Sequence, residues 1–504
     1  MTSMYLQICG RLTAEIVLAV VALAVLVLDL ILARRTVTMS ARMQMVACVA
    51  GFGLIAAMIV LVLGWDQEPV VLLGGTLVMD QLTILFKFVV AGLSLLTVVI
   101  SIRYDVGRHV GEYFAMLLFG TIGMMLLVGA EELIMIFVAL ELTSISLYVL
   151  TAFNKASPAL ARNSGEAAIK YFMFGGISSA FLLFGLSYVY GLTGVTSLDD
   201  LSRIISQPGA VHASPMLAAG MLFVIVGFGF KVAVVPFHLW APDAYEGAPT
   251  PVTALIATGS KVASFFVLLK LMLVSFGGMA GSAFWGHFAS GWTMLLAVVA
   301  TASMVLGNFA AIAQHNVKRL LAYSSIAHAG YILVGLVAAT KMGATSVLFY
   351  LIVYALANLG AFGVLAALSG RAGGEDMANF NGMARRAPFM SLLMLVFLLS
   401  LAGIPPLGGF LGKFYLFAAA VQRDPQQFGL LWLVIIGLLT SAVSLYYYLI
   451  VLKHFYVEKP VDASRIETPV YLNVALALVA AGVIALGLFP QALLALLDNL
   501  VGNL

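Results

Sequence analysis

Four ionisable side chains lie far inside long apolar stretches of this sequence: Glu141, Lys231, Lys261 and Lys413. Glu141 stands in ALELTSISLY, and the three lysines stand in GFGFKVAVVPFH, ATGSKVASFF and GGFLGKFYLF. A charge at the centre of a bilayer costs roughly 2.5 to 3.5 kcal/mol, so such groups are rare and are usually functional. The alternative is structural: the carboxylate pairs with a base, and each amine binds carbonyls at a helix break.

A buried amine beside a buried carboxylate is suited to moving protons. The pKa of a lysine in water is about 10.4, burial lowers the pKa of such an amine, and a nearby carboxylate raises it. At about 4 Å and an effective dielectric constant of about 20, the two charges attract by about 4 kcal/mol. Making or breaking such a pair would switch an amine between holding and releasing its proton. We therefore expect a proton-translocating unit.

Other ionisable residues in apolar stretches are weaker candidates. His328, in YSSIAHAGY, has a side chain whose pKa suits a proton relay, although a lone histidine is often structural. Lys170 and Lys270 lie near the ends of apolar runs, where a lysine stem can reach the interface. Lys87 is either a contact to another subunit or a structural residue.

The composition places most of this chain in lipid. Of its 504 residues 63% are hydrophobic and only 9% are charged, whereas about a quarter of the residues of soluble domains are charged. Long apolar runs recur along the chain, and each can cross a bilayer as a helix. We expect an all-α polytopic membrane protein with about fourteen transmembrane helices, at 14–33, 44–64, 78–101, 113–130, 132–153, 167–190, 217–238, 251–275, 291–312, 318–340, 345–368, 388–420, 429–452 and 469–489.

The distribution of basic residues predicts the orientation. Basic residues concentrate in cytoplasmic loops. An outside N-terminus puts 15 of the 25 lysines and arginines on the cytoplasmic side, Lys318 and Arg319 among them, and four on the other side. We therefore expect a multi-pass protein of the bacterial inner membrane with both termini periplasmic.

Two interrupted helices in matching positions predict an internal repeat. The seventh expected helix carries Gly227, Gly229 and Pro236, and the twelfth carries a Pro and Gly cluster from Gly403 to Gly409. Five helices separate equivalent positions, and an odd number inverts the second block, as in transporters built from inverted repeats. We expect two discontinuous helices, two inverted five-helix repeats at 111–290 and 291–455, three preceding helices in 1–110, and a C-terminal loop and helix in 456–504.

Three motifs resemble those of a known family. The stretch KVAVVPFHLWAPDAYEGAPTPVTALIATGSK, together with YSSIAHAGY and LAGIPPLGGFLGKFYLF, is similar to the antiporter-like membrane subunits of respiratory complex I and of multisubunit cation/proton antiporters. The resemblance covers residues 113 to 455. Lys261 stands where two of the three large complex I paralogues usually carry histidine, so the chain looks most like the third, the N type.

The resemblance implies roles for the buried residues. It implies that Glu141 and Lys231 form the switching pair of a first half-channel, that Lys261 connects to Lys413, and that Lys170 is the lysine of helix six. It also implies that this chain carries no cofactor, because NADH, flavin, iron–sulfur clusters and quinone bind other subunits. The implied neighbours are M-type and K-type membrane subunits and the lipid bilayer, with no nucleic acid. Cys9 and Cys48 are isolated and cannot form an iron–sulfur or zinc site.

Two other functions remain open at this stage. A subunit of a cation/proton antiporter or of a membrane-bound hydrogenase would use the same buried charges, and sodium-sensitive transport would favour the antiporter. A structural spacer would make the charges dispensable. Neutral substitutions at Glu141 and Lys231 would then have no effect.

Overall fold

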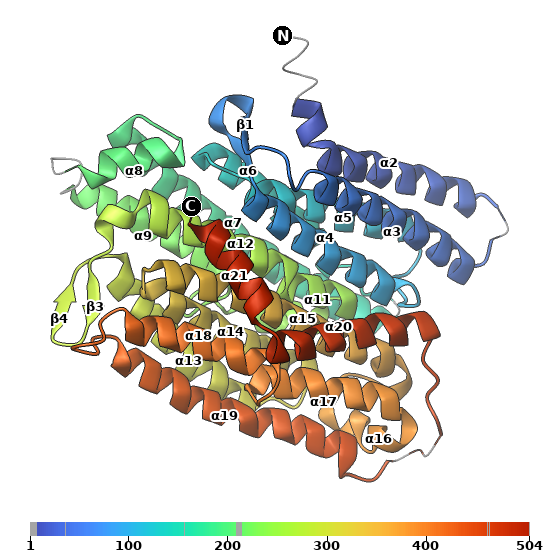
Figure 1. The fold of residues 1–504 in the computed structure, drawn as a ribbon. Helices are drawn as coiled ribbons and strands as arrows, with labels where there is room; N and C mark the ends of the chain where they lie inside the picture. Colours follow the sequence, from blue (N-terminus) through green and yellow to red (C-terminus); the bar gives the residue numbers. More distant parts are fainter. Residues whose placement is uncertain are drawn as a thin grey trace. The chain divides into compact units, whose positions relative to one another are not determined.

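The computed structural model describes residues 8–35, 37–155, 157–207, 214–460, 462 and 464–502 (Figure 1). The chain divides into two compact units. The first unit comprises residues 1–231 and 247–278, and the second comprises residues 232–246 and 279–504. The division into four sequence segments stays a prediction.

Every expected transmembrane run overlaps one or more helices. Among the described residues, twelve helical segments are long and apolar enough to cross a membrane, which confirms the polytopic all-α fold. They are α2 (Thr13–Ala33), α3 (Met39–Leu63), α4 (Gln81–Ser101), α5 (Val110–Val128), α6 (Leu133–Thr151), α7 (Pro158–Thr193), the segment Thr250–Ser275, α13 (Trp292–Ile312), α14 (Val317–Val337), α15 (Lys341–Ala372), α19 (Leu431–Tyr456) and α20 (Val470–Leu488).

Polar residues just before the apolar runs set where many of these helices begin. A side-chain oxygen there accepts a hydrogen bond from an N–H of the first turn, which has no partner within the helix. Within the described part of the chain, six helices begin this way, at Thr38, Asp80, Glu132, Ser157, Asn316 and Thr340.

The first unit packs α2, α3 and α4 beside α5 (blue in Figure 1). A two-stranded hairpin, β1 (Val70–Leu72) and β2 (Leu77–Met79), joins α3 to α4, with the one-turn η1 (Leu73–Gly75) at its tip. Helices α6 and α7 follow, then the short α8 (Leu198–Ser206) and α9 (Pro215–Lys231). The unit ends with α11 (Thr250–Ala257), α12 (Gly259–Lys270) and the π-helical turn η2 (Leu271–Ser275).

The second unit holds α10 (Trp240–Gly247) up to Glu246, and the chain from residue 279 onward. A hairpin of β3 (Ser282–Phe284) and β4 (His287–Ala289) follows the short turn η3 (Gly277–Met279) and precedes α13. After α14 and α15 come η4 (Met377–Phe380), α16 (Met383–Arg386), α17 (Pro388–Ala402), α18 (Gly408–Gln422), α19, α20 and the short α21 (Gln491–Val501).

The same order of elements recurs in the two expected repeats. Each repeat has two ordinary helices and then one unusually long helix, α7 with 36 residues and α15 with 32. Both long helices end at a glycine in the left-handed conformation, Gly194 and Gly373. A broken helix follows each, as the paired Pro and Gly clusters predicted.

The two expected breaks are present. Helix α9 stops at Lys231, and the next helix begins only at Trp240. Helix α17 stops at Ala402, where Gly403 adopts a φ of 88°, and α18 begins at Gly408. Proline cannot donate a backbone hydrogen bond, so the turns around Pro236 and Pro405 cannot continue the helices.

A third break was not predicted. The run 251–275 was expected as one helix, but Thr258 leaves the helical conformation with φ −120° and ψ −75°, which separates α11 from α12. No proline marks this position. The break lies three residues before Lys261, so all three candidate lysines lie close to an interruption of their helix.

Candidate functional site

Glu141 and Lys231 come together in the first unit. Glu141 lies on α6 and Lys231 is the last residue of α9, and their Nζ and Oε1 atoms are 4.0 Å apart. The side chain of Lys231 is only 7% exposed and that of Glu141 is 28% exposed. At this separation the charges attract without direct contact, so a small movement can make or break the pair.

Hydroxyl groups surround the two charges. The amine of Lys231 donates to Ser144 Oγ at 2.5 Å and to Tyr148 Oη at 3.4 Å. The carboxylate of Glu141 accepts a hydrogen bond from Ser179 Oγ at 2.5 Å. Glu141, Ser144 and Tyr148 are spaced three and four residues apart on α6, so they lie on one face of that helix. A proton leaving Lys231 therefore meets hydroxyl oxygens on that face.

Tyr148 is held in place by a close packing arrangement. Its ring packs edge-on against Tyr171, with centroids 4.5 Å apart. Gly175, one turn further along α7, lies so close that a Cβ built there would overlap the Tyr148 hydroxyl. The glycine thus creates the space in which Tyr148 reaches Lys231.

Lys261 lies in the first turn of α12, directly after the break at Thr258, and is 1% exposed. The segment Thr250–Ser275 that carries it is the most enclosed of the twelve spans. Lys261 belongs to the first unit and Lys413 to the second. Their connection stays a prediction.

Lys413 binds the broken end of α17 in the second unit. Its amine donates to the carbonyl oxygens of Leu401 and Ala402 at 3.0 and 3.1 Å, and to Ser441 Oγ at 2.9 Å. The amine also lies 4.9 Å from the centre of the Tyr331 ring. These carbonyls have no partner within their helix because α17 ends there. The lysine is therefore both a charge and the group that satisfies the break.

His328 is fully buried on α14, and each ring nitrogen contacts a tyrosine. Its Nδ1 is 2.6 Å from Tyr350 Oη, and its Nε2 is 3.1 Å from Tyr448 Oη. The Tyr448 hydroxyl also hydrogen bonds to Ser324 Oγ. The imidazole therefore sits inside a chain of hydroxyls, as a relay requires.

A second set of polar contacts lies beside His328. Asn308 donates to Tyr331 Oη at 2.9 Å and accepts from Tyr447 Oη at 3.0 Å. Sequence reasoning missed these residues because it considered charges alone. A signal was present in α19, where Thr440, Ser444, Tyr447 and Tyr448 recur at helical spacing.

Lys170 is less buried than the other candidates. It pairs with Glu166 one turn earlier on α7 at 2.7 Å, and 42% of its side chain is exposed. It was expected near a helix end, but α7 begins at Pro158, so Lys170 lies well inside that helix. Its role in a proton pathway stays a prediction.

Three buried ion pairs escaped the sequence reading. Lys87 on α4 binds Glu15 on α2 at 2.6 Å, and Lys270 pairs with Glu131. Lys318 was expected in a cytoplasmic loop but is wholly buried in the first turn of α14, 3.1 Å from Glu375. The pairing could not be read from the sequence, because the partner carboxylate is 57 positions away and left no local signal.

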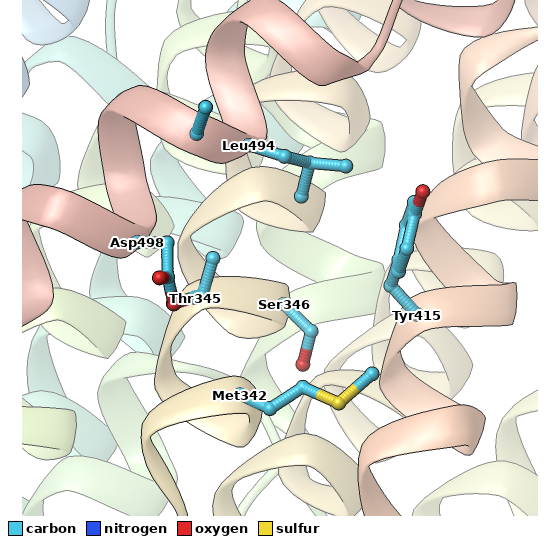
Figure 2. A pocket seen from close by; sticks show the side chains of 7 residues that line it. Met342, Thr345, Ser346, Tyr415, Leu494 and Asp498 are labelled. Atoms are coloured by element: carbon cyan, nitrogen blue, oxygen red, sulfur yellow. The ribbon is translucent and has the colours of Figure 1, made fainter.

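A cavity of about 260 Å³ lies apart from these groups, between α15, α18 and α21 (Figure 2). Its lining includes Met342, Ser346, Tyr415 and Leu494, and its one charged lining residue is Asp498. Asp498 pairs with Lys341 at 3.2 Å. No candidate lysine or histidine lines this cavity.

Comparison with known proteins places these residues in context. The pattern of the family described as NADH:quinone oxidoreductase/Mrp antiporter, TM, matches residues 130–444. The chain is 46% identical over 491 residues to NADH-quinone oxidoreductase subunit N 2 of Acidobacterium capsulatum, which covers 95% of this chain and 96% of the relative. It is 40% identical over 481 residues to NADH-quinone oxidoreductase subunit N of Desulforamulus reducens, with 95% of each chain covered.

Solved structures share the fold. A chain of respiratory complex I from Thermus thermophilus with bound aureothin aligns with a TM-score of 0.77 and 32% identity, covering 96% of this chain and 98% of that one. A chain of an archaeal membrane-bound sulfane sulfur reductase aligns with a TM-score of 0.85 at 24% identity, covering 98% and 97%. The latter likeness concerns the fold alone.

Proposed function

Because the chain belongs to the NADH:quinone oxidoreductase/Mrp antiporter family, on the branch of the N subunits of complex I, we propose a residue-level route for its proton translocation. The chain is a membrane subunit of a proton-translocating oxidoreductase, and quinone reduction takes place elsewhere in the complex. In our proposal, Glu141 and Lys231 form the switch, and Lys261 and Lys413 continue the route. His328 relays protons in the second unit.

The arrangement of Glu141 and Lys231 carries this proposal. The 4.0 Å separation leaves the pair poised between association and separation, while Ser144 and Tyr148 offer the amine alternative hydrogen-bond partners. When the carboxylate approaches, the amine holds its proton; when it withdraws, the proton can pass to a neighbouring oxygen. A purely structural ion pair would close to direct contact, as Lys87 and Glu15 do at 2.6 Å.

The route beyond the switch rests on the same logic. Lys261 and Lys413 are almost fully enclosed, and each lies beside a break in its helix. Broken helices in matching positions of two repeats are where transporters bind their ions. We assign Lys170 a peripheral part at most, because its side chain is the most exposed of the set.

The test is a double-mutant cycle in the reconstituted whole complex. Lys231→Met should abolish most coupled proton transfer, and Glu141→Gln should lower it by removing the charge that stabilises the protonated amine. The double variant should be no worse than Lys231→Met, because residues that act as one unit are not additive. Proton uptake and NADH oxidation are measured together in sealed vesicles.

Two outcomes would contradict this proposal. If the two single losses multiply in the double variant, the residues act separately and the switch is wrong. If both single variants pump normally, the charges are dispensable and the subunit is a spacer. Lys87→Met serves as the matched control for losing a buried amine, because Lys87 lies outside the proposed route. This substitution leaves Glu15 without its partner and should reduce stability more than proton pumping.

The setting of the subunit follows from the same family. We propose that it lies in the bacterial inner membrane with both termini periplasmic, between an M-type and a K-type neighbour. NADH, flavin, iron–sulfur clusters and quinone would then bind other subunits. Identifying the subunits that copurify with the chain tests this assignment, because an antiporter, a hydrogenase and an NADH-oxidising complex differ in them.

A further inference from the structure

A track of hydroxyl groups runs along the facing sides of α14 and α15 in the second unit. On α14, Ser325 and His328 lie one turn apart; on α15, so do Tyr350 and Tyr354. Ser325 Oγ is 2.7 Å from Tyr354 Oη, and His328 Nδ1 is 2.6 Å from Tyr350 Oη. The two helices are therefore joined by two hydrogen-bonded pairs, Ser325 with Tyr354 and His328 with Tyr350.

Asn358 lies one turn after Tyr354 on the same face of α15. It is fully buried, and neither its Nδ2 nor its Oδ1 has a hydrogen-bond partner among the residues that the structure describes. Buried polar groups are nearly always paired, and those that lack a protein partner usually bind ordered water. An amide with both ends free inside a protein is thus a site for a small polar ligand.

The neighbours of Asn358 show what this site would join. Residues four apart on a helix lie on one face. Tyr354, one turn before, shares Ser325 with Tyr245 of α10, whose hydroxyl is 3.3 Å from Ser325 Oγ. Phe362, one turn after, packs its ring against the ring of Tyr245, with centroids 6.1 Å apart. Asn358 therefore faces Tyr245 from the α15 side.

Helix α10 also carries charged groups, which bind the first turn of α14. Asp243 and Glu246 both bind Arg319, at 2.7 and 2.8 Å, and the backbone oxygen of Glu246 accepts a hydrogen bond from Lys318 at 3.0 Å. Tyr245 lies between these two acids in the sequence but on another face of the helix, so α10 holds the charged cluster on one side and a hydroxyl of the track on another.

We propose that Asn358 binds a buried water that bridges Tyr245 and Tyr354, and so gives the His328 track a second connection to α10 beside the one through Ser325. This inference rests on the proposed function, in which His328 relays protons. The amide is a positioning residue: its Nδ2 donates to the water, its Oδ1 accepts from it, and the water hands a proton on as it receives another. The net charge of the track is unchanged after each transfer.

The first experiment is a map of the whole complex that resolves waters. We expect density for a water at about 2.7–3.2 Å from the Asn358 amide and within the same range of both Tyr245 Oη and Tyr354 Oη. A map with clear waters elsewhere and none at Asn358 would overturn the proposal, whatever the pumping assays report.

The second experiment compares Asn358→Leu with Asn358→Ser in reconstituted vesicles. Leucine removes both hydrogen-bonding groups and fills the site, and should lower proton uptake per NADH oxidised at least twofold. Serine leaves room for water and keeps a hydroxyl, and should retain more than half of the coupled uptake. Asn499→Leu, the same change at an exposed position of α21, should have no effect.

The outcomes separate this inference from the proposed function. An Asn358→Leu complex that pumps fully and melts at a higher temperature would show that the amide has no part in proton transfer. It would contradict the proposed water site and leave the proposed function untouched. A Lys231→Met complex that pumps fully would contradict the proposed function instead. If the leucine variant does not assemble, the serine variant and the water density decide.

Discussion

At the scale of single residues, the cost of burying charge made the main candidates visible. Glu141, Lys231 and Lys413 are ionisable groups in apolar runs, and the structure gives each a polar partner inside the protein. The partners themselves could not be read from the sequence. Lys231 binds hydroxyls more than 80 positions away. The sequence around Asn308 contains no pattern that indicates its hydrogen bonds to Tyr331 and Tyr447.

Gly175 offers a test of how tightly the switch is built. In Gly175→Ala, the new methyl group would overlap the Tyr148 hydroxyl, so Tyr148 must move away from Lys231. We expect coupled proton uptake to fall several-fold and stability to drop by about 1–3 kcal/mol, as for other overpacked cores. Proton uptake and thermal unfolding of the purified complex are the measurements.

Gly176→Ala is the matched control for this change. The neighbouring glycine has no atom within 4 Å of the position where its Cβ would lie. This variant should therefore pump normally and be no less stable. Equal losses in both variants would mean that α7 tolerates no alanine there, and that the Tyr148 contact is not the cause.

At the scale of elements, the place of the spans could be predicted, but not every interruption. Apolar runs of bilayer length are the strongest signal a sequence contains, and Pro and Gly clusters revealed the breaks after Lys231 and Ala402. The break at Thr258 has no such marker. The hairpins and α21 are too short for their periodicity to stand out from connecting loops.

Gly403 tests whether the break in α17–α18 positions Lys413. Gly403 adopts a φ of 88°, a conformation that costs roughly 1–2 kcal/mol for a residue with a Cβ. A Cβ there would also lie 3.2 Å from Lys413 Cδ. Gly403→Ala should lower the unfolding temperature and displace the amine from the carbonyls of α17, so that pumping falls while NADH oxidation with an uncoupler persists.

Gly370→Ala is the control for that element. Gly370 lies within α15 with open space around it, and alanine forms helices better than glycine by about 1 kcal/mol. This substitution should be neutral or slightly stabilising. If Gly403→Ala behaves the same way, the left-handed turn does not hold Lys413 in place.

At the scale of the whole molecule, contacts between connections bear on the helix count. An even number of spans must separate two loops that touch outside the membrane. Arg11 donates to the backbone oxygen of Glu68 at 3.1 Å, with two helices between them. In the second unit Lys341 pairs with Asp498, with four expected spans between them. Each contact therefore agrees with the expected number of spans between its two residues.

The native cysteines allow the proposed orientation to be tested with little engineering. Cys9 is exposed just before α2, on the side that the basic residues assign to the periplasm, whereas Cys48 lies within the apolar helix α3. In a Cys48→Ser background, a membrane-impermeant maleimide added to intact spheroplasts should label Cys9. A cysteine placed at the exposed Lys459, in the connection between α19 and α20, should react only after the membrane is opened, because that loop is expected to be cytoplasmic. Labelling of Lys459→Cys but not Cys9 in intact spheroplasts would reverse the orientation and place the buried cluster of Lys318 and Glu375 on the periplasmic side.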